Sequence, residues 1–264
     1  IFAGMRSDGT TIIKAKKSRN HTELMCKYLG LPILVKNKKN YDEIKISKVK
    51  KIKPFNYKIP SDISSSAFFI VLTVLSKNSK LIIKDVNINV SRIGIIHILK
   101  KMGAYIIFKN QRNYKGEKIA DIEVKGGKAL NSINCPSKLN SGAIDEFLII
   151  FLAAARAKGT SYFKDLAELN QKESPRLKWG AKILNMIGVK NIVTKDSIKI
   201  YGNPQFKVKK NIVIKNYLKD HRVFMTSMVA ALTFGGNWKI HDKDSIKTSF
   251  PNFLKIINEL KKND

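Results

Sequence analysis

Apolar residues recur every three to four positions in six stretches of the chain, and this spacing places them on one face of a helix. The stretch at 175–187 (PRLKWGAKILNMI) is amphipathic, whereas that at 143–158 (AIDEFLIIFLAAARAK) contains the longest apolar run of the sequence. The pattern predicts helices over 64–76, 91–102, 143–158, 175–187, 220–234 and 251–262.

Short runs rich in β-branched and aromatic residues lie between these helices, as is typical of strands. The elements follow the order helix, strand, helix, strand, strand, and the order then begins again. This alternation indicates an α/β (α+β) fold. The runs predict strands over 80–84, 104–109, 119–125, 160–164, 189–194, 197–201 and 237–241.

An aspartate marks the same place in successive repeats, because the first helices begin near Asp62, Asp145 and Asp220. The interval is roughly 70 to 85 residues, which is longer than in ordinary solenoids. We therefore expect three units from residue 61 onward, preceded at 1–58 by the tail of another.

The lysine-rich segment at 45–62 contains Pro54 and Pro60 and separates that tail from the three units. Prolines restrict the backbone and are common in turns and connections. We interpret the segment as a crossing between two bodies and the hinge of a two-lobed protein. An ordinary strand followed by a loop accounts for it equally well.

Composition indicates a globular protein, because 44% of the residues are hydrophobic. No apolar run approaches the ~20 residues that a membrane span requires.

The opening IFAGMRSDGTTI lacks the features of a signal peptide, and because the first residue is Ile1 we expect the chain to begin inside a longer protein. Cys26 and Cys135 are the only cysteines, so we expect a reducing, cytoplasmic location. The four histidines are scattered and predict no metal site.

The formal net charge of +30 suggests binding to anions. The lysines are spread over every segment, and no Lys/Arg block with interleaved aromatic residues predicts a nucleic-acid surface. We therefore expect a general cationic surface that attracts small anions, with no nucleic acid or membrane as partner. Only seven residues are arginine, and four of them fall at or near predicted helix starts: Arg19, Arg92, Arg176 and Arg222.

Helix starts offer free N–H groups and the positive end of the helix dipole, which suits the capture of an anion. Arginine is unfavourable there for the helix itself, so its presence suggests that an anion binds. Lys172 and Glu173 lie in the same turn as Arg176, and Pro175 suits the first helical position, which would hold this turn rigid. The aspartates at the helix starts could equally serve as N-caps.

Six collinear segments resemble the enolpyruvyl transferase family, and within it the branch that acts on shikimate 3-phosphate. The resemblance covers essentially the whole chain, which corresponds to about the C-terminal three-fifths of such an enzyme. The segments are SRNHTELM (18–25), IPSDISSSAFF (59–69), AIDEFLIIFLAAARAKGT (143–160), KESPR (172–176), DHRVFM (220–225) and TSFPNF (248–253).

The resemblance implies a two-lobed fold of repeated βαβαββ units, an inside-out α/β barrel with helix starts aimed at the cleft between the lobes. On this basis 1–60 is the last unit of the first lobe, and 61–264 is the second lobe with three units. The other units of the first lobe, the N-terminal lobe, are missing here. We expect a monomer when the protein is complete, and no appreciable turnover by these 264 residues alone.

The implied reaction transfers the enolpyruvyl group of phosphoenolpyruvate to shikimate 3-phosphate and releases phosphate, a step of the shikimate pathway to chorismate that needs no metal or organic cofactor. By resemblance, Arg176 and Arg222 bind phosphoenolpyruvate, and Arg19, Asp145 and Lys172 face shikimate 3-phosphate. The same resemblance makes Asp145 the base for the attacking hydroxyl, Glu173 the acid for the methylene carbon, and Lys172 the group that stabilises phosphate charge and tunes Glu173.

Two positions depart from the family pattern. Pro175 stands where an acidic residue is common, and Lys247 is displaced by one position from a phosphate-contacting lysine of some relatives.

Two alternative functions stay open. The first is the family branch that acts on UDP-N-acetylglucosamine, which the KESxR and DHR pair disfavours. The second is a basic nucleic-acid-binding or RNA-processing protein on a similar fold.

Overall fold

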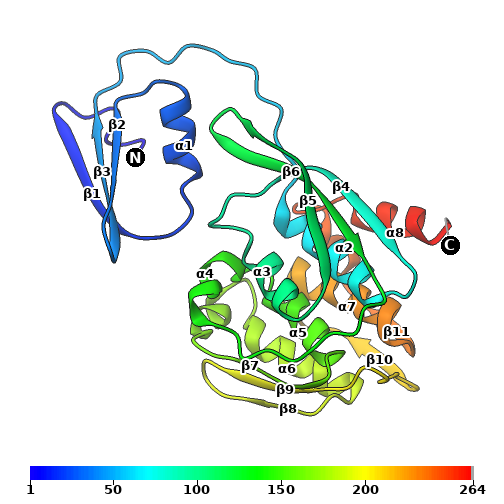
Figure 1. Ribbon diagram of the computed structural model, residues 1–264. Coiled ribbons are helices and arrows are strands. Elements are labelled where there is room, and N and C mark those ends of the chain that lie inside the picture. The colour runs from blue at the N-terminus through cyan, green and yellow to red at the C-terminus, as the bar shows by residue number, and fades with distance from the viewer. Residues whose placement is uncertain (263–264) are drawn as a thin grey trace.

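The computed structural model describes residues 1–262, which form two bodies with separate hydrophobic clusters (Figure 1). We call residues 1–47 the N-terminal body and residues 61–262 the C-terminal body. Residues 48–60 connect them without regular secondary structure. Within the range 45–62, residues 45–47 end a strand and residues 48–60 cross to the other body. The interpretation as a strand describes the first part of this range, and the interpretation as a crossing describes the rest. Within residues 1–262, none of the helices is long and apolar enough to span a lipid bilayer.

The N-terminal body is one antiparallel sheet covered by one helix. Its strand order is β1-β3-β2, and its buried cluster consists of Met5, Cys26, Ile44 and Ile46. The sequence pattern predicted the tail of a unit here but none of its individual strands. The elements are β1 (Thr10–Lys16), α1 (His21–Tyr28), β2 (Ile33–Asn37) and β3 (Tyr41–Ser47).

The C-terminal body contains the predicted order of elements twice in full, and within residues 1–262 a third unit follows the same order only through its helix, strand and second helix. The first unit has sheet order β4-β6-β5, and the second has order β7-β9-β8. The first unit comprises α2 (Ile63–Leu75), β4 (Lys80–Asn87), α3 (Gly94–Lys101), β5 (Tyr105–Tyr114) and β6 (Glu117–Lys125). The second comprises η1 (Ser137–Leu139), α4 (Asn140–Ala143), α5 (Phe147–Ala155), β7 (Gly159–Phe163), η2 (Ala167–Gln171), α6 (Arg176–Ile187), β8 (Asn191–Val193) and β9 (Ile198–Gly202).

The third unit contains β10 (Asn211–Ile214), α7 (His221–Phe234), β11 (Asn237–Ile240), η3 (Lys243–Ile246) and α8 (Phe253–Lys262). The strand β10, which the sequence pattern missed, pairs in parallel with β11 across α7. Isolated parallel bridges take the place of β10 in the other two units, between Ser61 and Val86 and between Asn134 and Tyr162. A parallel pair requires a crossover, and the first helix of each unit supplies it. The predicted α/β repeat is therefore confirmed.

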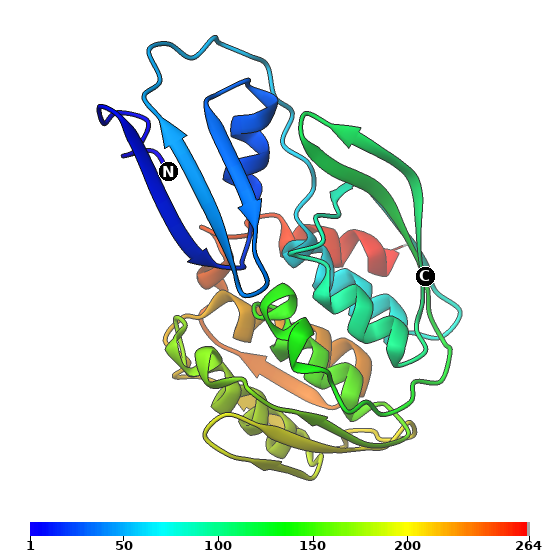
Figure 2. The same ribbon diagram turned by 60° about the vertical axis from the view of Figure 1, so that its left-hand side comes forward.

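The first helices of the three units, α2, α5 and α7, pack against one another at the centre, and the sheets lie outside them (Figures 1 and 2). Every residue of α5 is buried, which explains why this helix is apolar on all sides. The predicted inside-out arrangement is thus confirmed, and the starts of the central helices lie close together.

Two predicted helices differ from the observed ones. The helix predicted over 143–158 is α5, which begins only at Phe147 because residues 144–146 form a tight turn after α4, in which the N–H of Glu146 bonds to the carbonyl of Ala143 (2.9 Å), only three residues back. Arg222 donates to the carbonyl oxygen of Asp145 (2.7 Å) and holds this bend. The helix predicted from 91 begins at Gly94, because the Asn89 side chain accepts from the Ser91 N–H (2.9 Å) in a preceding turn.

Two glycines set how closely α3 and α4 approach. A Cβ on Gly94 would lie 2.6 Å from the carbonyl carbon of Gly142, whereas a Cβ on Gly142 would lie 3.4 Å from its nearest neighbours. We expect Gly94→Ala to lower the free energy of unfolding by about 1–3 kcal/mol, because two backbones must separate. Gly142→Ala is the matched control and should change it by less than about 1 kcal/mol. Urea-induced unfolding measures both, and equal losses would contradict this account of the contact.

Candidate active site

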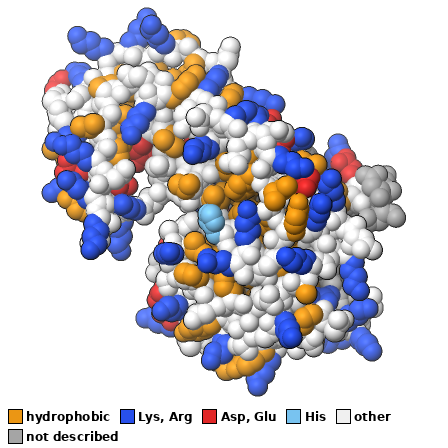
Figure 3. All heavy atoms as spheres, viewed as in Figure 1, with side chains coloured by type: hydrophobic (Ala, Val, Ile, Leu, Met, Phe, Trp, Pro, Cys, Tyr) orange, Lys and Arg blue, Asp and Glu red, His pale blue; other side chains and the backbone are white. Residues whose placement is uncertain are grey.

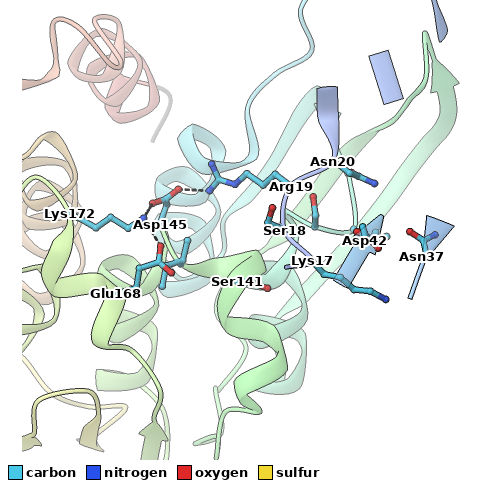
Figure 4. Close-up of a pocket in the computed structure, with 13 residues that line it drawn as sticks. Lys17, Ser18, Arg19, Asn20, Asn37, Asp42, Ser141, Asp145, Glu168 and Lys172 are labelled. Carbon is cyan, nitrogen blue, oxygen red and sulfur yellow. Dashed lines mark hydrogen bonds and ion pairs between the residues drawn. The ribbon is translucent and has the colours of Figure 1, made fainter. Parts of the chain in front are cut away.

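A cleft of about 640 Å³ lies between the two bodies (Figure 4), in agreement with the notch visible between them in the space-filling view (Figure 3). Lysine and arginine side chains are scattered over both bodies on the face in Figure 3 and form no block. The N-terminal body contributes Lys17, Ser18, Arg19, Asn20, Asn37 and Asp42 to the cleft, and the C-terminal body contributes Val90, Ser91, Ser141, Ile144, Asp145, Glu168 and Lys172.

Asp145 is the meeting point of three cations from different parts of the chain. Its carboxylate accepts from Arg19 of the N-terminal body at 2.5 Å. It lies 3.5 Å from the Nζ of Lys172 and 3.5 Å from the Nη1 of Arg176. Figure 4 shows Asp145 between the side chains of Lys172 and Arg19, which reach it from opposite sides of the cleft. The structure therefore brings four of the sequence-predicted residues together.

The charges around Asp145 control its protonation. Burial alone would raise its pKa, but the hydrogen bond from Arg19 and the charges of Arg222, Arg19 and Lys172 outweigh burial and lower the pKa to about 2. Asp145 is therefore ionised at neutral pH. Its pairing stabilises the fold above the ordinary pKa of 3.8, and this contribution is lost as the pH falls toward 2.

The turn before α6 presents Lys172 and Glu173 on different sides. Lys172 bonds to Glu168 (3.0 Å) and approaches Asp145, so it faces the cleft. Glu173 has a half-exposed side chain that pairs with Arg176, and it lines neither this cleft nor the second hollow described below. Among the ion pairs of residues 1–262, none joins Lys172 to Glu173. Pro175 was predicted to be the first residue of the helix, but it occupies the N-cap, and α6 begins one residue later at Arg176.

Arg176 is buried and is held by a buried acid from the next unit. Its Nε donates to Asp220 at 2.9 Å, and the Ser174 hydroxyl donates to the same carboxylate oxygen at 2.8 Å. Burial alone would raise the pKa of Asp220, but the hydrogen bond and charge of Arg176 outweigh it and lower the pKa. This pair joins the KESPR turn to the DHR turn.

Arg222 lines a second hollow of about 270 Å³ at the starts of α2 and α7. Its guanidinium donates to the Asp145 carbonyl and lies 3.5 Å from Glu146. Burial raises the pKa of Glu146, although the neighbouring Arg222 opposes this effect. Arg222 thus lies beside Asp145 and contacts its backbone carbonyl. Lys247 lines neither hollow.

The aspartates at the three helix starts have two different roles. Asp62 caps α2 by accepting from the Ser65 N–H (2.8 Å), and Asp220 caps α7 by accepting from the Arg222 N–H (2.9 Å). Asp145 is not a cap, because it lies in the bend between α4 and α5, and the N-cap position of α5 is Glu146. The aspartate without a capping bond is the one that faces the cleft.

Sequence reasoning missed Asp220 and Glu146 as partners of the site arginines. Asp220 lies two positions before Arg222 and Glu146 directly follows Asp145, and both of these neighbours were predicted site residues. The signal that was available is that buried arginines require acidic partners. Which acid would reach which arginine depends on how the units pack, and no pattern along one segment contains that information.

Comparison with known proteins shows the family. A profile of EPSP synthase (3-phosphoshikimate 1-carboxyvinyltransferase) matches residues 1–257. The 3-phosphoshikimate 1-carboxyvinyltransferase of Ruthia magnifica subsp. Calyptogena magnifica is 40% identical over 261 residues, which are 98% of this chain and 58% of that protein. The same enzyme of Thermodesulfovibrio yellowstonii is 35% identical over 99% of this chain and 60% of its own length. The chain thus spans about three-fifths of the curated relatives it matches.

Solved structures agree in fold. EPSP synthase from Acinetobacter baumannii matches with a TM-score of 0.88 and 35% identity, over 97% of this chain and 58% of that one. The enolpyruvyl transferase NikO from Streptomyces tendae matches with a TM-score of 0.70 over 98% of this chain and 57% of that one. At 14% identity, NikO supports the fold alone.

The pKa of Asp145 tests the geometry of the cleft directly. We expect Arg19→Ala to raise this pKa, because a hydrogen bond and a nearby positive charge are both lost. Arg112→Ala is the control, since Arg112 pairs with Asp85 away from the cleft. Carboxyl ¹³C chemical shifts followed against pH measure the change, with Asp145→Asn to assign the signal. An unchanged pKa in Arg19→Ala would show that the pair does not form in solution.

The Arg176–Asp220 pair should dominate the stability of the site. Asp220→Ala leaves a buried guanidinium without its main partner, which typically costs about 3–5 kcal/mol. Asp8→Ala, which removes an exposed pair with Lys48, should cost less than about 1 kcal/mol. Denaturant-induced unfolding of both variants gives the two values, and similar losses would contradict the buried arrangement.

Proposed function

Because the chain belongs to the EPSP synthase family, we propose that it is the C-terminal part of a 3-phosphoshikimate 1-carboxyvinyltransferase. The complete enzyme would transfer the enolpyruvyl group of phosphoenolpyruvate to shikimate 3-phosphate, release phosphate, and serve the shikimate pathway to chorismate. We assign 1–60 to the last unit of a first lobe and 61–264 to a second lobe. The separate hydrophobic clusters of the two bodies and the threefold repeat of the second support this division.

The observation that carries the proposal is the convergence of Arg19, Lys172 and Arg176 on Asp145 from three segments of the chain. Both substrates carry a phosphate and a carboxylate, and guanidinium groups can bind either with two parallel hydrogen bonds. A cleft that holds several cations around one ionised acid is suited to bind such anions and to accept a proton from a hydroxyl.

Within the protein, carboxylates pair with the cations that the substrates need. We propose that the phosphate of shikimate 3-phosphate takes Arg19 and Lys172 away from Asp145. Since these two residues help to lower the pKa of Asp145, their loss raises it. Asp145 then becomes a stronger base at the moment when the attacking hydroxyl arrives.

The same exchange would prepare Glu173 for its role as an acid. Glu173 pairs with Arg176. Phosphoenolpyruvate bound at Arg176 and Arg222 would draw Arg176 toward the ligand and leave Glu173 free to take up a proton. Glu173 would give this proton to the methylene carbon in the addition step and remove one in the elimination step.

The proposed chemistry uses only side chains and needs no metal or organic cofactor. Phosphate is the leaving group, and Lys172 would stabilise its charge. We further propose that the complete protein is a cytoplasmic monomer, which is compatible with the two free, buried cysteines.

The direct test is an assay of the full-length protein for phosphate release from phosphoenolpyruvate. We expect release with shikimate 3-phosphate as acceptor and none with UDP-N-acetylglucosamine. Release with only the second acceptor would overturn the assignment. Salt-sensitive binding to random oligonucleotides without any turnover would favour a nucleic-acid-binding protein.

The role of Arg222 can be tested by a conservative change. We expect Arg222→Lys in the full-length enzyme to raise the KM for phosphoenolpyruvate tenfold or more, because an ammonium group lacks the two-pronged geometry of a guanidinium. Arg112→Lys, on an exposed residue of β5, should leave the KM within about twofold, since exposed pairs contribute little. Steady-state kinetics with both variants decides, and equal effects would count against the assignment.

A further inference from the structure

The start of α1 is tied to the C-terminal body by three consecutive residues, the last of which is the first residue of the helix. Arg19 reaches Asp145 in the cleft. The side-chain oxygen of Asn20 accepts from Asn89 Nδ2 at 2.9 Å, and His21 Nδ1 bonds to Glu117. Since an ionised carboxylate can only accept, the nitrogen of His21 is the donor. The Arg19 contact belongs to the site described above, and the other two have no part in the proposed chemistry.

Asn89 and Glu117 form a buried and preorganised receptor for this segment. Both residues are only 5% exposed, and Asn89 Nδ2 also donates to Glu117 at 3.1 Å. The orientation of the Asn89 amide is fixed because its oxygen accepts from the N–H and the hydroxyl of Ser91 (2.9 and 2.8 Å). Its NH₂ group therefore points to Glu117 and Asn20.

Asn20 gives up a local interaction to make this contact. It occupies the N-cap of α1, yet its side chain makes no capping hydrogen bond. A cap of this kind is typically worth about 1 kcal/mol to a helix. The side chain instead crosses to the other body, so the local stability of α1 is exchanged for a fixed position relative to the C-terminal body.

The β5–β6 hairpin brings Glu117 to this place and also contacts α1 beside it. At the hairpin tip, a Cβ on Gly116 would lie 2.8 Å from the Leu24 carbonyl of α1. Tyr114, at the end of β5, accepts from the Lys58 N–H of the crossing segment (3.0 Å). The hairpin extends from the C-terminal body to the side of α1 (Figures 1 and 2).

We propose that Glu117 and Asn89 are positioning residues that act through Arg19. They fix the backbone at Asn20 and His21, so that the neighbouring Arg19 is presented to the cleft in one orientation. The Arg19 side chain itself is 41% exposed and has few other restraints. Holding a flexible side chain in place before binding reduces the entropy that a ligand must overcome. The consequence for shikimate 3-phosphate rests on the proposed function.

Full-length Glu117→Gln is the test variant, because a carboxylate accepts at both oxygens whereas an amide accepts at one. The variant therefore loses one of the two acceptors, so that either His21 or Asn89 loses its donor bond to this side chain. The matched control is Glu123→Gln on the same strand, since Glu123 is 3% exposed and pairs with Lys109 (2.8 Å) within one body. We expect Glu117→Gln to raise the KM for shikimate 3-phosphate about tenfold with kcat within twofold, and Glu123→Gln to change neither by more than twofold.

A double-mutant cycle separates positioning from general stability. If Glu117 acts through Arg19, Glu117→Gln should have no further effect on this KM in an Arg19→Ala background. Independent, multiplicative effects of the two changes on the KM would overturn the proposal, as would an equal effect of Glu123→Gln.

Hydrogen–deuterium exchange of the ligand-free full-length protein tests the anchor without relying on activity. We expect Glu117→Gln to speed exchange of the backbone amides in residues 17–28, and Glu123→Gln to leave them unchanged. Absence of turnover in the unmodified protein would refute the proposed function while exchange still decides on the anchor. Unchanged exchange at 17–28 in Glu117→Gln would refute the anchor itself.

Discussion

The carboxylate of Asp145 is the interaction on which the arrangement of the cleft depends. It lies in a bend between two helices, and cations from the N-terminal body, from the turn before α6 and from α6 itself surround it. Unscreened, these cations would repel one another. One acid that is mostly buried and fully ionised holds them within reach of a shared cleft and joins the two bodies at the same point.

The three repeated units explain how such a centre can form. Their first helices pack together, so the helix starts, with their caps and charged residues, are brought into one region. Because a charge removed from water requires a partner, the loss of either residue of a buried ion pair there destabilises the fold. Asp220 illustrates this, since it caps α7 and also holds Arg176 of another unit. The residues proposed to bind anions therefore also stabilise the fold.

Much of this could be predicted from one segment at a time. Apolar periodicity located six of the eight α-helices of residues 1–262, and the recurrence of aspartate and arginine at helix starts revealed the repeat. Six short segments were enough to identify the family, since each keeps its chemistry in consecutive residues. The boundaries that failed depend on distant contacts. Arg222 holds the bend that delays the start of the helix predicted from 143, and the strand β10 is defined by its partner β11 on the far side of α7.

The sequence alone determined the repeated α/β unit, the family and the set of charged residues that could bind anions, because these follow from residue type and spacing along the chain. Only the tertiary structure decided which charges meet. It made Asp145 a hub and Asp62 and Asp220 caps, although all three precede similar helices, and it placed Glu117 beside His21. Such pairings arise from the packing of separate units, and their energies depend on burial, which no local pattern specifies.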